Sequence, residues 1–322
     1  PPARGTLTSI EWERNRARPN RMLPYRHIHG DNAQVLRRII VPLILAIAAA
    51  GCATVSPESD FSPPRIALVG DSWPLIMRFH GGFKEAFVEE GYRPRQVRNI
   101  AIGWSYAGIG ERRLAFQGIE SYRYIEEDRF ADLERAIERY PTIEIIHFTL
   151  GGADFLHDMP GGLPPYEQER YFREHVTPHI DAILTRLETS FPDKLIAFVG
   201  YDFLNFRDLR LEHKRTRQRW ERLGRPDAAA LNEMSWRLNQ LQQEIVARHP
   251  GVMFVDVLGF TKARLGANGS FWEPSPRDGM WRDGMHLSRE GNVALARYCL
   301  DMGYRERLMP LRDARGRLIP RA

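Results

Sequence analysis

The sequence predicts an α/β fold: a three-layer α/β/α sandwich in which helices cover both faces of a five-stranded parallel sheet. Five short apolar runs of strand length recur along the chain, and longer segments with helical periodicity separate them. Alternation of this kind is typical of a doubly wound parallel sheet, because parallel strands are joined by crossover helices. No Pro/Gly-rich linker divides these segments, so one domain over residues 65–310 accounts for them.

The same pattern sets the expected boundaries of the elements. Pro141 and Pro250 follow helical segments that cannot continue through a proline, and Ser288 stands where an N-cap residue would precede the last helix. The expected strands are Ile66–Val69, Val97–Ile102, Ile143–Leu150, Leu195–Val199 and Val252–Val257. The expected helices lie near Pro74–Glu90, Asp128–Tyr140, Tyr171–Ser190, Asp227–His249 and Ser288–Met302.

A leader of the export type precedes this domain. Residues 1–51 contain a cationic pair, Arg37-Arg38, followed by the apolar run Ile39–Ala50 and then Gly51-Cys52. A cationic flank, about a dozen apolar residues and small residues before a cleavage point describe a secretory signal, and such a run is short for a transmembrane helix. The leader therefore predicts export.

The cysteine that ends the leader indicates a lipid anchor. Ala49-Ala50-Gly51-Cys52 resembles the lipobox of bacterial lipoproteins, in which the cysteine is lipidated and becomes the first mature residue. Ala49 stands where leucine is most common, and a plain secretory signal with a chance cysteine is the alternative. We expect a cell-envelope protein, lipid-anchored to a bacterial membrane through Cys52, with a secreted or periplasmic protein as the alternative. Residues 52–64 are then a polar tether and residues 311–322 a C-terminal tail.

The basic excess of the chain belongs to the leader. Of 46 Lys and Arg and 41 Asp and Glu, residues 1–51 hold eight and three, which leaves 38 of each sign for the remainder. A body with balanced charge gives no electrostatic reason to expect nucleic acid as a partner. Besides Cys52 the chain has only Cys299, which excludes a disulfide framework, and the helical pattern around Cys299 predicts a small core residue.

A serine follows directly on the first predicted strand. The run Ile66–Val69 ends in Gly70-Asp71-Ser72, and a helical segment begins at once. The hydroxyl of Ser72 is thereby delivered to the carboxyl end of a strand, where open α/β sheets place their chemistry. Ser72 is a candidate nucleophile, provided that the chain supplies a base, an orienting acid and oxyanion donors.

An Asp and a His three residues apart lie just before the last predicted helix. The segment Arg282–Ser288 contains Asp283 and His286 in a glycine-containing loop. This spacing lets the carboxylate hold one ring nitrogen while the other faces a serine from elsewhere. A surface histidine beside a chance aspartate is the alternative for this pair taken alone.

Two glycine-containing turns follow two other predicted strands. The first, Asn99–Gly108, could aim the backbone N–H of Gly103 at the same point as Ser72, and a tight strand-to-helix turn is the alternative. The second is Leu150-Gly151-Gly152-Ala153-Asp154. Stabilising an oxyanion requires fixed donors of this kind near the nucleophile.

Taken in order, these segments resemble the blocks of the SGNH (GDSL-type) hydrolase family over residues 65–302. The resemblance implies a flavodoxin-like sheet, Ser72 as nucleophile, His286 as general base and Asp283 as its orienting acid. It also implies that the backbone N–H groups of Ser72 and Gly103 form the oxyanion hole. No cofactor is needed, and the substrates implied are small-molecule, glycan or lipid esters.

One block departs from the family pattern. The family's Gly-x-Asn-Asp reads Gly151-Gly152-Ala153-Asp154, so Ala153 replaces the asparagine that supplies a third oxyanion donor. Loss of one such donor typically costs about 10²–10³ in rate, whereas loss of the nucleophile or base costs on the order of 10⁶. We therefore expect a slow or differently assisted ester hydrolase acting through an acyl-enzyme on Ser72. A catalytically weak or inactive envelope binding protein on the same fold is the alternative.

Three further features are weighed against this hypothesis. Gly103-Trp104-Ser105-Tyr106-Ala107 nearly matches a nucleophile elbow and would make Ser105 the nucleophile of an α/β-hydrolase, but its fifth position is alanine. The arginine-rich segment 202–225 is either a lid or anion-binding face over the site, or a solvated helix face. The scattered histidines form no compact ligand set, so no metal site is expected.

The lipid-anchor hypothesis predicts a modified mature N-terminus. Mass spectrometry of the protein purified from a bacterial membrane fraction should find Cys52 as the first residue, carrying acyl chains. An unmodified N-terminal residue beyond Cys52 would contradict the anchor and indicate a plain secretory signal.

Overall fold

The computed structural model describes residues 61–103, 121–124, 127–204, 214–264 and 280–322, and its centre is a five-stranded parallel sheet. The strand order is β2-β1-β3-β4-β5, which is the order of flavodoxin-like doubly wound sheets. The strands are β1 (Ile66–Gly70), β2 (Ala101–Ile102), β3 (Ile145–Thr149), β4 (Leu195–Val199) and β5 (Val252–Val255). The predicted fold class is therefore confirmed.

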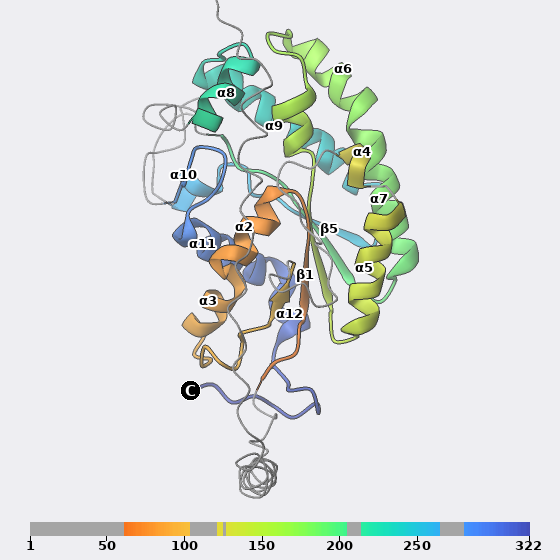
Figure 1. The fold of residues 1–322 in the computed structure, drawn as a ribbon, viewed down its shortest axis with the longest axis vertical. Coiled ribbons are helices and arrows are strands. Elements are labelled where there is room, and N and C mark those ends of the chain that lie inside the picture. Colours follow the sequence, from red (N-terminus) through yellow and green to blue (C-terminus); the bar gives the residue numbers. More distant parts are fainter. Residues whose placement is uncertain (1–60, 104–120, 125–126, 205–213, 265–279) are drawn as a thin grey trace, which may run out of the picture. The chain divides into compact units, whose positions relative to one another are not determined.

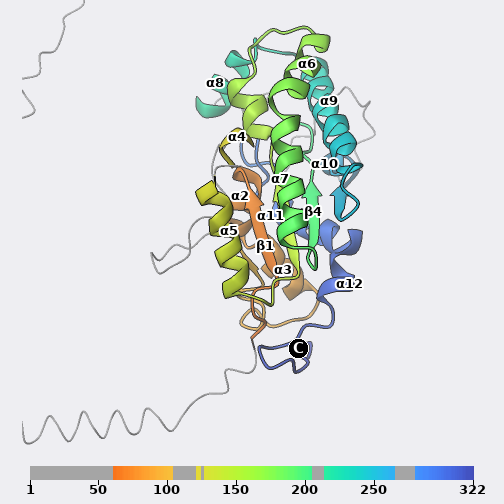
Figure 2. The ribbon, with the colours of Figure 1, turned by 90° about the vertical axis from the view of Figure 1, so that its right-hand side faces the viewer.

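Helices cover both faces of this sheet, as Figures 1 and 2 show. One face carries α2 (Ser72–His80), α3 (Gly82–Glu89) and α11 (Arg289–Cys299), and α11 packs closely on both of the others. The other face carries α5 (Glu127–Arg139), α7 (Thr177–Ser190) and α9 (Ala228–Val246). The remaining helices are α4 (Ser121–Tyr124), η2 (Asp154–Asp158), α6 (Pro165–His175), α8 (Lys214–Arg222), α10 (Phe260–Arg264), η4 (Leu300–Tyr304) and α12 (Arg305–Leu308).

The apolar runs predicted as strands form the core between these two helical layers. All residues of β1 and β3 are buried, as is expected for strands that are covered on both faces. The two strands pair in register from Ile66 opposite Ile145 to Gly70 opposite Thr149. Cys299 is also fully buried, as its helical pattern predicts.

Two of the predicted helices are each broken into two. The segment Pro74–Glu90 is interrupted at Gly81, whose φ of 70° ends α2 before α3 begins. The segment Tyr171–Ser190 is interrupted at Val176, because Pro178 at the start of α7 has no N–H to continue the helical hydrogen bonds of α6. The predicted strand Val97–Ile102 is reduced to the two residues of β2, and the other helix and strand predictions differ from the structure chiefly at their ends.

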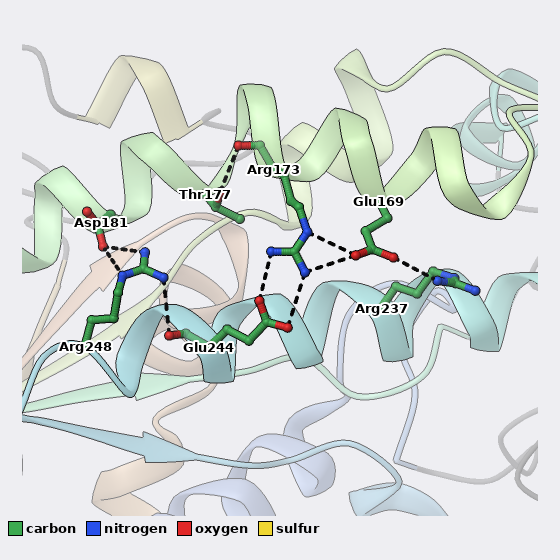
Figure 3. Close-up of polar contacts among 7 residues, drawn as sticks. All are labelled: Glu169, Arg173, Thr177, Asp181, Arg237, Glu244 and Arg248. Carbon is green, nitrogen blue, oxygen red and sulfur yellow. Dashed lines mark hydrogen bonds and ion pairs between the residues drawn. The ribbon is translucent and has the colours of Figure 1, made fainter.

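Ion pairs on the outer surface tie α6 and α7 to α9 (Figure 3). Arg173 of α6 donates to Glu244 of α9 at 2.9 Å, and Arg237 of α9 lies 3.2 Å from Glu169 of α6. Arg248, just beyond α9, lies 2.6 Å from Asp181 of α7. Exposed ion pairs of this kind each contribute little to the free energy of unfolding. Burial of the apolar faces of these helices therefore contributes most of the stabilisation between them.

The last residues of the chain lie against the domain. Leu311 and Ile319 are buried, a bridge joins Arg312 to Leu318, and the N–H of Ala322 donates to the carbonyl of Gly91 at 2.6 Å. Within the described ranges, no helix has the length and apolar character needed to cross a bilayer. The leader and Cys52 lie outside the described residues.

The end of β1 requires a glycine, and this can be tested by substitution. A Cβ on Gly70 would lie 1.9 Å from the carbonyl oxygen of Thr149, and the φ of Gly70 is 123°. Gly316→Ala is the matched control, because Gly316 also has a positive φ, of 75°, but nothing lies within 4 Å of its Cβ position. We expect Gly70→Ala to cost roughly 3–5 kcal/mol of unfolding free energy, from strain and overlap together, and Gly316→Ala about 1–2 kcal/mol. Urea denaturation measures both; equal losses would show that the close approach to Thr149 is unimportant.

Candidate active site

The candidate site begins at the carboxyl ends of β1 and β3. The chain order reverses between these neighbouring strands, and ligands of doubly wound folds bind at such switch points. Asp71 is the N-cap of α2, and its Oδ1 accepts a hydrogen bond of 3.0 Å from the N–H of Trp73. Ser72 is therefore the first residue of the helix, where backbone N–H groups have no partner within the helix.

The structure brings Ser72, His286 and Asp283 into one hydrogen-bonded series. The Oγ of Ser72 lies 2.9 Å from Nε2 of His286. The other ring nitrogen, Nδ1, lies 2.9 Å from Oδ2 and 3.0 Å from Oδ1 of Asp283. A carboxylate can only accept, so Nδ1 carries the hydrogen and Nε2 is left to accept from the serine hydroxyl when the ring is neutral.

A short loop fixes the acid and the base. Oδ1 of Asp283 accepts from the backbone N–H groups of Met285 and His286, at 3.0 and 2.9 Å. Burial works against the charged form of Asp283, but the hydrogen bond and charge of His286, together with these N–H groups, hold the pKa of the carboxyl below its usual value. Asp283 is thus held as a carboxylate, the form that accepts from the Nδ1–H of His286.

The neighbouring elements hold this loop in place. The indole N–H of Trp73, on α2, donates to the carbonyl of Met285 at 3.0 Å, so the helix that carries Ser72 is bonded directly to the loop that carries His286. From the other side, the hydroxyl of Thr216 on α8 donates to the carbonyl of Asp283 at 2.7 Å. Both contacts are buried and therefore screened little by solvent.

The other two residues predicted to lie near Ser72 are Ala153 and Gly103, and only Ala153 lines the cavity. Ala153 is buried and lines the same cavity as Ser72 and His286. Gly103 is buried at the end of β2, where a Cβ would lie 2.9 Å from the Cβ of Leu68 on β1. Although it is among the described residues, Gly103 is not part of the cavity lining.

The sequence reasoning missed Tyr201. This residue follows β4 closely, lines the cavity, and its hydroxyl donates to Oδ2 of Asp71 at 2.5 Å while accepting from the N–H of Gly152 at 2.9 Å. Its position beyond the carboxyl end of a parallel strand was the available signal, since the same rule selected Ser72.

The cavity has a volume of about 510 Å³. Its lining combines apolar side chains such as Leu156, Leu204 and Met285 with polar groups, and Gln218 and Arg219 of α8 form part of its wall. Part of the arginine-rich segment 202–225 therefore borders the site, while residues 205–213 lie outside the described part of the chain.

Two other hypotheses from the sequence concern Ser105 as the alternative nucleophile and a metal site. Ser105 lies outside the described residues. Among the residues that the structure describes, no group of three or more His, Cys, Asp or Glu side chains is arranged to hold a metal ion.

Comparison with known proteins gives likenesses of structure only. No protein-family model and no curated protein sequence matches the chain. A protein from Streptococcus pneumonia, provisionally described as a platelet activating factor, is 16% identical and matches 84% of this chain and 97% of its own, with a TM-score of 0.48.

Two further matched structures are described as esterase and lipase. A family 3 carbohydrate esterase from Talaromyces cellulolyticus is 11% identical over 76% of this chain and 97% of that one, with a TM-score of 0.44. An extracellular lipase from Streptomyces rimosus is 14% identical over 74% and 99%, with a TM-score of 0.43. Likenesses this distant do not identify a family or an activity for the chain.

Proposed function

We propose that this protein is a serine hydrolase that cleaves carboxylic esters. The observation that carries the proposal is the contact of 2.9 Å between Oγ of Ser72 and Nε2 of His286, with Nδ1 of the same ring held by Asp283. These are a nucleophile, a base and an orienting acid in hydrogen-bond reach of one another, which is the arrangement that hydroxyl-nucleophile catalysis requires.

In the proposed reaction, Oγ of Ser72 attacks the ester carbonyl carbon and Nε2 of His286 takes the hydroxyl proton. The tetrahedral intermediate collapses to an acyl-enzyme on Ser72, and His286 returns the proton to the departing alcohol. Water then attacks the acyl-enzyme with His286 again acting as base, which releases the acid and restores the serine. Asp283 stabilises the imidazolium that forms at each stage.

The oxyanion would be bound by the backbone N–H of Ser72, and Gly103, which lies against β1 outside the cavity lining, would be the second donor only after a local shift toward the site. Support for Ser72 comes from its place at the first residue of α2, where the N–H is free of helical partners and the helix dipole favours negative charge. Ala153 lines the cavity without contributing a polar group, so one fewer donor is available than in the SGNH pattern.

We infer a small-molecule, glycan or lipid ester as the substrate, hydrolysed in the bacterial cell envelope by a protein anchored through Cys52. The mixed polar and apolar lining of the cavity suits an ester with an apolar acyl group and a polar alcohol. The matched structures described as a carbohydrate esterase and a lipase have substrates within this class.

The proposed nucleophile can be tested by covalent labelling. We expect a fluorescent organophosphonate to label the wild-type protein, to label Asp283→Asn more slowly, and not to label Ser72→Ala at all. The reason is that only an activated serine reacts at a useful rate. Ser105→Ala is the control and should label like the wild type. Loss of labelling in Ser105→Ala instead would support an α/β-hydrolase mechanism, and no labelling of the folded wild type would support a binding protein.

The missing oxyanion donor gives a gain-of-function test. We expect Ala153→Asn to raise kcat on a chromogenic acetyl ester by up to about 10²-fold, since one donor amide is typically worth that much. Ala153→Leu matches the size of the new side chain without its amide and should give no increase. An equal response of the two variants would show that position 153 does not face the developing oxyanion.

A further inference from the structure

We propose that Tyr201 is a positioning residue for Ser72. The Tyr201 side chain joins the turn that carries the serine to the loop in which Ala153 stands in place of the expected oxyanion asparagine. The inference rests on the proposed ester hydrolysis and assigns a role that the serine, histidine and aspartate do not fill. Its basis is a chain of buried hydrogen bonds that runs from one side of the site to the other through a single phenol oxygen.

Three hydrogen bonds make up this chain. The N–H of Gly152 donates to the Tyr201 oxygen at 2.9 Å, and the Tyr201 hydroxyl donates to Oδ2 of Asp71 at 2.5 Å. Oδ1 of Asp71 accepts from the N–H of Trp73 at 3.0 Å. The loop after β3, the end of β4 and the first turn of α2 are thus bonded to one another around Ser72.

The direction of each bond is fixed by chemistry. A backbone N–H can only donate, so the Tyr201 oxygen must accept from Gly152 and its hydrogen is left for Asp71. Burial and the neighbouring carboxylate raise the pKa of Tyr201 well above its usual value, which keeps the phenol protonated. Replacing this hydroxyl by hydrogen therefore removes a donor from Asp71 and an acceptor from Gly152 together.

Packing leaves the Tyr201 ring little freedom. The side chain is buried, and the Trp73 ring meets it edge-on with centroids 5.3 Å apart. A Cβ on Gly152 would lie 2.8 Å from ring carbons of Tyr201, so the glycine at 152 is what allows the ring to lie against this loop. The phenol oxygen is consequently held at a defined point between the loop and α2.

This arrangement bears on the reaction through Asp71. Ser72 follows directly on this N-cap residue, so a shift of the Asp71 side chain moves both the nucleophile and its backbone N–H. Displacement of reacting groups by about 1 Å can cost on the order of 10² in rate. With no amide at position 153, fewer donors remain to compensate for such a displacement.

The charge of Asp71 provides a readout that packing alone would not change. Burial raises the pKa of Asp71 to about 6, while the hydrogen bonds from Tyr201 and Trp73 and the charge of His286 lower it and the charge of Asp154 raises it. Removing the Tyr201 hydroxyl removes one of the lowering contributions. Asp71 then binds its proton at a higher pH, and activity that depends on the carboxylate is lost earlier as the pH falls.

The test compares Tyr201→Phe with Tyr304→Phe, using a chromogenic acetyl ester and the full chain. Tyr304 is the matched control, because it is also fully buried and its hydroxyl also makes a buried hydrogen bond, at 2.9 Å to His147. We expect Tyr201→Phe to lower kcat about 10- to 100-fold with little change in KM, and to shift the acidic limb of the kcat profile to higher pH. Tyr304→Phe should leave the kcat, KM and pH profile near those of the wild type.

A double variant separates the role of the carboxylate from that of His286. Asp71→Asn and the double variant Asp71→Asn/Tyr201→Phe both lack the carboxylate that interacts with His286, so the comparison of these two variants is free of that charge. In Asp71→Asn no carboxyl titrates at this position, so adding Tyr201→Phe should produce no further shift of the limb. A shift of the same size in the Asp71→Asn background would overturn the inference.

The outcomes also separate this inference from the proposed function. Organophosphonate labelling and ester hydrolysis by the wild type, with kinetics of Tyr201→Phe equal to those of Tyr304→Phe, would overturn the role of Tyr201 and leave the hydrolase intact. A wild type that is neither labelled nor active would overturn both. A loss of kcat in Tyr201→Phe with an unshifted pH profile would indicate a packing role and would also overturn the inference.

Discussion

The close approach of β1 and β3 at their carboxyl ends is the constraint on which the site depends. Gly70 pairs with Thr149 at a φ that other residues rarely adopt, and it has no side chain to push the strands apart. The chain can then turn directly into α2, with the N–H of Asp71 donating to the carbonyl of Thr149 at 3.0 Å. This turn places the N-cap aspartate and the following serine over the point where the sheet order reverses.

Distant segments reach this point through buried polar contacts. The Trp73 indole bonds the start of α2 to the loop of residues 283–286, and Tyr201 bonds the same turn to Gly152. Buried polar groups are costly when unpaired, so each of these contacts specifies one arrangement of its partners. Asp71 is buried in this arrangement, and burial raises the pKa of its carboxyl to about 6. The few hydrogen-bond donors that face the carboxylate offset this rise only in part.

Sheet and helix positions were predictable because they depend on local pattern. Fully apolar runs bounded by turns gave five strands, and Ser288 is the N-cap of α11, its Oγ accepting from Gly291. The breaks at Gly81 and Val176 were not predicted, because the helices were assigned from apolar periodicity, although Gly81 and Pro178 are local signals of an interruption. The order of strands in the sheet cannot be read from periodicity at all.

By itself the sequence determined the fold class and the identity of Ser72, Asp283 and His286 as candidates, because strand ends and short spacings are local features. Only the tertiary structure decided that Nε2 of His286 lies 2.9 Å from the serine, since residues 214 positions apart meet through packing of α2 on the loop before α11. The contacts of Tyr201 were likewise decided by the tertiary structure, because its hydrogen bonds join segments that are separate in the chain. Hydrogen-bond partners over such separations are fixed by burial and complementary geometry, which exist only in the folded protein.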